Sequence, residues 1–187
     1  MRDRIRTYTG RWFRPLAPTV DDIDIEDIAH ALSNICRWTG HVKQFMSVAQ
    51  HSVLVSQVCK PEDALSGLLH DASEAYLADL ASPVKHAASM EAYRKAERKL
   101  QTVIYQRFGL PLRMLASVAL ADKLVLAAEA RALMGFEWPE GLEIPEGLRI
   151  EPLAPSDAKV QFLERYWDLS GELEDAACQD AALTGKA

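Results

Sequence analysis

Long hydrophobic runs and paired cysteines are both missing from this sequence. A membrane-spanning helix needs about 18 or more consecutive apolar residues, so none is expected. The positive charges within residues 1–15 are followed by no hydrophobic stretch, which argues against a signal peptide and favours a cytoplasmic protein with no membrane partner. The three cysteines are widely spaced and include no Cys-x-x-Cys pair, so neither a disulfide framework nor a thiolate zinc site is expected.

An excess of basic residues is lacking as well. The chain carries 27 acidic and 21 basic residues and a net charge of −6, whereas nucleic-acid-binding proteins usually show a basic excess or a basic stripe. We therefore expect no nucleic acid polymer as a partner. A basic cluster near the N-terminus is either a phosphate-facing patch or a solvated face or oligomer contact; it comprises Arg2, Arg4, Arg6, Arg11 and Arg14.

Several motifs of common enzyme classes are absent too, namely GxSxG, the Walker A loop, GxGxxG and HExxH. The chain does have the composition of a folded domain, with 187 residues of which 49% are apolar and 26% are charged. This length allows one sizeable core and falls short of two full-sized domains. We therefore expect residues 1–187 to form a single domain.

Helical periodicity dominates the chain after residues 1–20, which are expected to form an extended arm or a short hairpin. Asp24 is placed to cap the first helix, and five more helices are predicted at 47–59, 61–76, 89–108, 112–134 and 156–170. Four of the nine prolines and three of the nine glycines lie in 135–155, which indicates a surface loop, and 171–187 is expected to be a weakly ordered tail. The predicted fold class is all-α, a single compact helical bundle.

Asp122 is the first candidate for chemistry because its predicted helix is apolar nearly all round. The positions one turn away are Val118, Ala119, Val125 and Leu126, and none of them can neutralise a carboxylate. An unpaired carboxylate in such surroundings would cost several kcal/mol. Asp122 must therefore meet a cation from elsewhere, which is either an arginine or lysine side chain or a metal ion.

Two histidines and a second aspartate flank the same presumed interior. His51 lies on the apolar stripe of the helix 47–59, where a lone histidine is more often a hydrogen-bonded core residue than a ligand. His70 and Asp71 sit beside the apolar stripe of the next helix. Together with Asp122 they supply two imidazoles and two carboxylates, a set that suits one divalent ion such as Mn, Co, Ni, Fe, Zn or Mg. Helical bundles commonly assemble such sites.

This pattern of His51, His70-Asp71 and Asp122 resembles that of the HD-domain metal-dependent phosphohydrolases. The surrounding segments resemble the bacterial HD-domain 5′-deoxynucleotidases: Cys36-Arg37-Trp38, SVAQHS at 47–52, LLHDASEAYLADLASPVKH at 68–86, and Ala121-Asp122-Lys123. The arm and the segment DDIDIEDIAH at 21–30 are closer to the phage-type HD phosphohydrolases that include dATP triphosphohydrolases. The resemblance covers about residues 5–135. The nucleotidase relatives usually have Glu before the first ligand, where this chain has Gln50.

The resemblance implies an all-α HD fold with the metal held by His51, His70, Asp71 and Asp122. It also implies catalytic roles for two acids at matching positions, Glu74 and Asp79. Glu74 is four residues after His70, which keeps it on the side of the site, where a carboxylate that does not bind the metal can move protons. Asp79 either orients the attacking water or caps the turn before Pro83.

Three more residues are candidates for substrate binding. Arg37, which the resemblance also marks, offers a planar fork of donors matched to phosphate, or else it is the partner of Asp122. Lys85 follows the break at Pro83 and either reaches a distal phosphate or is solvated. Trp38 either stacks on a base or packs in the core.

The function expected from these residues is a metal-dependent phosphohydrolase that cleaves the 5′ phosphate ester of a (deoxy)nucleotide. The substrate is either a monophosphate, cleaved to a nucleoside, or a dNTP, cleaved to a nucleoside and triphosphate. A homo-oligomer is expected from the resemblance. The alternatives are an HD hydrolase of another phosphoester, such as a cyclic nucleotide or ppGpp, and a non-catalytic nucleotide-binding adaptor. An adaptor has no need of acids beside the ligands, so Glu74 and Asp79 argue against it.

Overall fold

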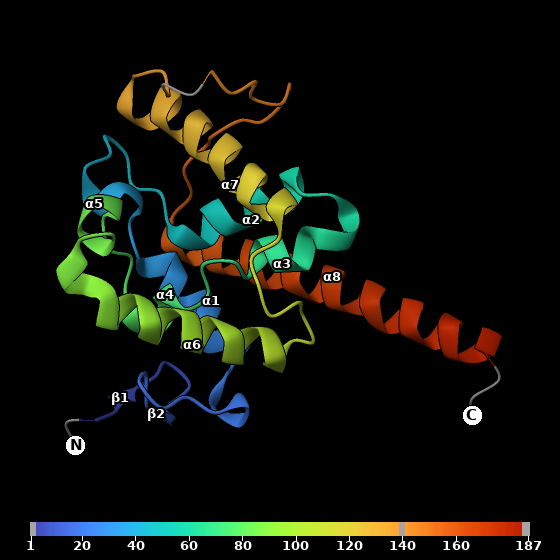
Figure 1. Ribbon diagram of the computed structural model, residues 1–187. Coiled ribbons are helices and arrows are strands. Elements are labelled where there is room, and N and C mark those ends of the chain that lie inside the picture. Colours follow the sequence, from blue (N-terminus) through green and yellow to red (C-terminus); the bar gives the residue numbers. More distant parts are fainter. Residues whose placement is uncertain (1–2, 139–140, 185–187) are drawn as a thin grey trace.

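The computed structural model describes residues 3–138 and 141–184, with side chains up to residue 171 (Figure 1). Most of these residues are helical. The helices are α1 (Ile25–Asn34), α2 (Val48–Val58), α3 (Ala64–Leu68), α4 (Glu74–Leu77), α5 (Ser82–Lys85), α6 (Glu91–Arg107), α7 (Ala116–Glu129) and α8 (Pro155–Thr184). Single 3-10 turns connect several of them, and a π-helical turn, Ala130–Met134, follows α7.

The N-terminal arm is a small hairpin that packs on its own chain. Strand β1 (Ile5–Arg6) pairs antiparallel with β2 (Trp12–Phe13), and Phe13 is fully buried in the core. At the tip, the backbone N–H of Thr9 donates to Asp27 Oδ1 at 2.7 Å, and the ring of Tyr8 stacks on His30 with centroids 3.9 Å apart. The predicted all-α architecture is therefore a mostly helical one with this two-stranded sheet added.

The caps and breakers of the sequence set most helix ends. Asp24 caps α1 by accepting the N–H of Glu26 at 2.9 Å, and Ser47 caps α2 by accepting the N–H of Gln50 at 3.1 Å, as is typical of N-cap side chains. The predicted helices at 24–35, 47–59 and 89–108 are confirmed to within two residues. The helix α8 extends to Thr184, beyond the predicted end at 170.

The prediction of one continuous helix over 61–76 is wrong. The chain forms α3, leaves the helix at Leu69, and forms α4 only from Glu74. The intervening turn is held by the side chain of Gln101, whose Nε2 donates to Leu69 O at 2.7 Å and whose Oε1 accepts the N–H of Ser73 at 3.0 Å. These tertiary hydrogen bonds replace helical ones, and the break falls at the His70-Asp71 pair.

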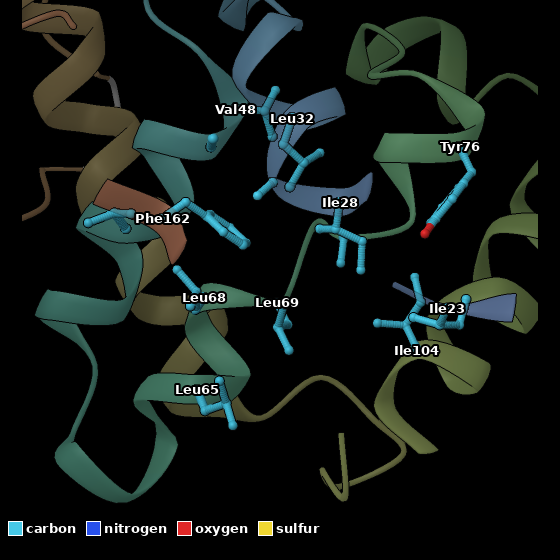
Figure 2. Packing of buried hydrophobic residues seen from close by; sticks show 14 of the residues in the cluster. Ile23, Ile28, Leu32, Val48, Leu65, Leu68, Leu69, Tyr76, Ile104 and Phe162 are labelled. Atoms are coloured by element: carbon cyan, nitrogen blue, oxygen red, sulfur yellow. The ribbon is translucent and has the colours of Figure 1, made fainter. Parts of the chain in front are cut away.

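The main core lies where α1, α2 and α3 meet α8, with α6 closing one side (Figure 1). Figure 2 shows its fully buried side chains, which include Ile28, Leu32, Leu68, Ile104 and Phe162. A second cluster joins α2 to α7 through Val55, Val118, Ala121 and Val125. The metal-ligand candidates lie on α2, on α7 and after α3, so both clusters fix their relative positions.

Three further findings complete the fold. Between 135 and 155, the described residues form no helix or strand before α8 begins. No helix of the described chain is long and apolar enough to cross a membrane. Cys36 and Cys59 are free thiols, and the side chain of Cys178 lies outside the described residues.

Candidate metal centre

The two candidate histidines come together because α2 and α3 approach closely. The point of approach is Gly67, where an added Cβ would lie 2.7 Å from Cys59 Sγ and 3.2 Å from Ser56 Cα. Any larger residue would push α3 away from α2. The absence of a side chain at Gly67 therefore allows His70, three residues later, to face His51 with ring centroids 5.3 Å apart.

Both imidazole rings are oriented by a bond at Nδ1. His70 Nδ1 lies 2.7 Å from Gly67 O, and a carbonyl oxygen can only accept, so Nδ1 carries a proton. His51 Nδ1 lies 2.7 Å from Glu129 Oε1. Both Nε2 atoms are buried and make no hydrogen bond within the described part of the chain. Histidines that bind a metal through one nitrogen typically donate the other N–H in this way.

The carboxylates of Asp71 and Asp122 face these two Nε2 atoms. His51 Nε2 lies 3.1 Å from Asp122 Oδ1, and His70 Nε2 lies 3.2 Å from Asp71 Oδ2. The crossed pairs, His51 with Asp71 and His70 with Asp122, are both 3.9 Å apart. Donor atoms about 2.0–2.2 Å from one ion would be about 3 Å apart, so the spacing fits a shared cation.

The possible ligand atoms of three of these residues lie close enough together to bind one metal ion. The donor atoms of His51, His70 and Asp71 all lie within 4.8 Å of one another, so this group can hold a metal ion. Asp122, on α7, is the most exposed of the four, with 37% of its side chain accessible. The structure thus brings all four predicted ligands together from three separate segments.

The electrostatics of the cluster also favour a cation. Burial alone lowers the pKa of His70, but the adjacent carboxylates of Asp71 and Asp122 outweigh burial and raise it to about 9. Burial raises the pKa of Asp71, but the facing His70 outweighs it and keeps that pKa well below its ordinary range. Without a metal, the excess negative charge is therefore balanced by protons on the imidazoles, and a divalent cation would take their place.

Glu129, at the end of α7, belongs to the site although the sequence analysis did not identify it. Its side chain is fully buried, and its Oε2 accepts the Nε–H of Arg37 and the indole N–H of Trp38, each at 3.1 Å. The same oxygen forms an ion pair with Nη2 of Arg37 at 3.1 Å. Glu129 follows Asp122 by seven residues, two helical turns on the same face of an apolar helix. The reasoning that singled out Asp122 therefore applies equally to Glu129.

The two acids predicted to be catalytic differ in environment. Glu74 is 4% exposed, its Oε1 accepts from Lys85 Nζ at 3.3 Å, and its buried Oε2 has no partner within the described chain. Burial, reinforced by the charges of Asp71 and Asp79, raises the pKa of Glu74 to about 9. Asp79 is half-buried just beyond α4, and burial also raises its pKa.

Lys85 and Arg37 are not free cations. Lys85 Nζ bridges Glu74 and Glu97, with the second contact at 2.8 Å. Arg37 is paired with Glu129 instead of Asp122, the partner considered from the sequence. The pairing engages Nε and Nη2 of the guanidinium and not Nη1.

A pocket of about 760 Å³ opens beside the cluster and gathers most of the predicted residues. Its walls include Arg37, Trp38, Asp71, Asp79, Lys85 and Asp122, together with His41, His86 and Trp138. Trp38 makes an edge-on contact with Trp138 at 5.9 Å. His51 and His70 are not part of this wall, so the pocket reaches the cluster from its carboxylate side. A pocket of about 490 Å³ reaches His70 and Asp71 from the side of α6.

Gln50, the position at which the chain departs from the nucleotidase pattern, holds the segment before α8. Its Nε2 donates to Glu151 O at 2.7 Å, and its Oε1 accepts the N–H of Leu153 at 3.0 Å. An ionised glutamate at this position could only accept, whereas the amide of Gln50 both donates and accepts. The residue preceding the candidate ligand His51 is thus fixed to the end of the loop.

Comparison with known proteins places the chain among relatives from two bacteria. The chain is 44% identical over 171 residues to the uncharacterized protein YfdR of Escherichia coli strain K12, covering 89% of this chain and 95% of that protein. It is 34% identical over 182 residues to an uncharacterized protein of Rhodobacter capsulatus, covering 86% of this chain and 92% of that protein. No family model matches the chain.

Proposed function

The chain belongs to the same family as the Escherichia coli protein YfdR, and we propose that it is a metal-dependent phosphohydrolase acting on the 5′ phosphate ester of a (deoxy)nucleotide. The observation that carries the proposal is the pair of buried Nε2 atoms of His51 and His70, which make no hydrogen bond within the described chain and face two carboxylates at 3.1–3.2 Å. Their Nδ1 atoms are already engaged, so a cation is the ligand that satisfies the set. The resemblance of the same residues to the HD-domain pattern supports the phosphohydrolase assignment.

One divalent ion would be held by His51, His70, Asp71 and Asp122. When bound, such an ion polarises a phosphoryl group and lowers the pKa of a water molecule. Two imidazoles and two carboxylates suit Mn, Co, Ni, Fe or Zn. His70 binds with the tautomer that its contact to Gly67 O imposes, because the Nδ1 proton leaves the Nε2 lone pair free.

The pocket beside the cluster has the size and lining of a nucleotide site. Its volume of about 760 Å³ falls within the range of about 300–1,000 Å³ that is usual for small-molecule sites. Trp38 and Trp138 offer aromatic surface for a base, and Nη1 of Arg37 is available for a phosphate oxygen. Because Arg37 is paired with Glu129, the divalent ion would supply most of the local positive charge that a small phosphate ester needs in a chain of net negative charge.

Glu74 is the side chain best suited to move a proton. Its raised pKa keeps the carboxyl protonated near neutral pH in the metal-free protein, and its Oε2 has no competing partner in the described chain. Glu74 lines neither pocket, so it would donate that proton to the leaving 5′ oxygen through a bound water, while Lys85 holds Oε1 in place. Asp79, on the pocket wall, would orient the attacking water.

The test is product analysis with metal-loaded protein. Incubation with dAMP and dATP, followed by identification of orthophosphate or triphosphate, distinguishes the two leaving patterns, and Asp71→Ala serves as the ligand-deficient control. Turnover of neither, across several metals and all common deoxynucleotides, would contradict the proposal. Parallel incubations with cyclic nucleotides and ppGpp test the other phosphoesters. The proposal includes a homo-oligomer, for which light scattering gives the mass in solution.

A further inference from the structure

Glu129 is the one fully buried acid among the described residues, and the reaction outlined above does not use it. Its two oxygens face different parts of the site. Oε1 meets the Nδ1 atom of the ligand His51 at 2.7 Å, and Oε2 receives the donors of Arg37 and Trp38 at 3.1 Å. One carboxylate therefore connects the metal cluster to the wall of the pocket.

The turn on the Oε2 side has a strained backbone. Trp38 and Thr39 both adopt left-handed conformations, with φ of 56° and 53°, and Gly40 follows with φ of 81°. A β-branched residue such as Thr is seldom found there, and consecutive residues of this kind persist only where their surroundings hold them. The indole N–H bond from Trp38 to Glu129 is such a constraint, and it acts on the first strained residue.

We propose that Glu129 is a positioning residue that couples the metal ligand His51 to the pocket-facing turn Arg37–Gly40. On this view, affinity for the metal and the shape of the substrate pocket depend on the same carboxylate. The inference rests on the proposed function for the identity of the ligands and of the pocket. Glu129 itself touches neither the metal nor the substrate in this scheme; it acts through the residues it holds.

A carboxylate is required because both of its oxygens must accept. In Glu129→Gln, one oxygen becomes an NH2 group, which can only donate. If the NH2 faces the turn, it places a donor against the N–H donors of Arg37 and Trp38, and their hydrogen bonds are lost. If it faces His51, it favours the tautomer with the proton on Nε2, the atom that must bind the metal. The amide in Glu129→Gln can therefore hydrogen-bond correctly either to His51 or to the donors of Arg37 and Trp38, but not to both.

Two variants of the full-length chain test this coupling. Glu129→Ala removes both contacts, and we expect Co²⁺ affinity, measured by calorimetry, to fall about 10–100-fold, the usual effect of removing the partner of a ligand. We also expect faster hydrogen exchange at residues 37–41, measured by mass spectrometry in the absence of metal. Glu129→Gln keeps the shape and should lose one of these two properties. Glu26→Gln, which removes a charge paired with Lys159 at 3.0 Å on the surface, is the matched control and should lose neither.

The outcomes separate this inference from the proposed function. Retention of either property by a folded Glu129→Ala would overturn the coupling. If Glu129→Ala fails to fold, which circular dichroism reveals, Glu129→Gln decides, because retention of both properties in that variant overturns the inference. If the unmodified chain binds no Co²⁺, the metal centre itself is refuted, whereas unchanged Co²⁺ binding in a folded Glu129→Ala refutes only the role of Glu129.

Discussion

Stability should fall with rising pH in the metal-free protein but not in the metal-loaded protein, and His70 is the residue that decides the difference. In the metal-free protein its pKa is raised from an ordinary 6.5 to about 9. A group whose pKa is higher in the folded state stabilises that state below its unfolded pKa, and this stabilisation is lost as pH rises toward the folded pKa. The metal-free protein, obtained with EDTA, should therefore lose stability between pH 6.5 and 9. With a metal on Nε2, this loss does not occur.

The size of the effect follows from the pKa difference. Between pH 6.5 and 8.5 the metal-free protein would lose about 2.2 kcal/mol through His70, because the full slope of about 1.4 kcal/mol for each pH unit is reached only well inside the interval from pH 6.5 to 9. For a chain of 187 residues, one kcal/mol corresponds to about 2–4 °C in Tm. The gap in Tm between metal-loaded and metal-free protein should thus widen by about 4–9 °C over this range.

The assay is thermal unfolding followed by circular dichroism at pH 6.5, 7.5 and 8.5, with either EDTA or saturating Mn²⁺. The control is the His70→Asn variant measured in EDTA, because it lacks the titrating ring. Its Tm should fall less as pH rises than the Tm of the natural chain in EDTA. A gap that stays constant or narrows as pH rises would refute the reasoning, since it would mean that no proton is exchanged for the metal at His70.

Three further outcomes are expected. Asp71→Ala should abolish retention of Mn²⁺ or Co²⁺ after dialysis, as elemental analysis would detect, and full occupancy would remove Asp71 from the ligand set. Glu74→Gln should keep the metal yet lose about 10²–10⁴-fold in kcat, the usual scale of general acid–base catalysis, whereas an unaltered kcat would exclude Glu74 from proton transfer. Gln50→Glu should lower the free energy of unfolding in urea by about 1–3 kcal/mol, because a carboxylate cannot donate to the carbonyl of Glu151; an unchanged unfolding midpoint would contradict this.

Most of the helices and the group of candidate ligands could be predicted because their signals are local. The cap at Asp24 and the end of the helical segment 112–134, which Gly135 follows, depend on the chemistry of single residues, and both appear where the sequence places them. The carboxylate of Asp122 has no residue one turn away that could neutralise it, which is why the sequence predicts a cation from elsewhere. The structure supplies a cluster in which two imidazoles and a second carboxylate face it.

The features that could not be predicted depend on contacts distant in sequence. The break at Leu69 is stabilised by Gln101, 32 residues away, which no helical periodicity reveals. Glu129 pairs with Arg37 across 92 residues, so its role depends on how α7 packs against the turn after α1. Glu129 could have been flagged as a buried acid from its spacing to Asp122, but its partners could not.

The placement of α8 has a consequence for how the chain is made. Phe162 from this helix is fully buried among residues of α1, α2 and α3, which precede it by about a hundred residues in the printed sequence. Contacts of such long range slow folding and delay its completion. A ribosome must therefore release the first turns of α8 before the core can close, and until then α1 and α2 expose apolar surface. Nascent chains halted before residue 155 should be substrates for chaperones and proteases instead of folded intermediates.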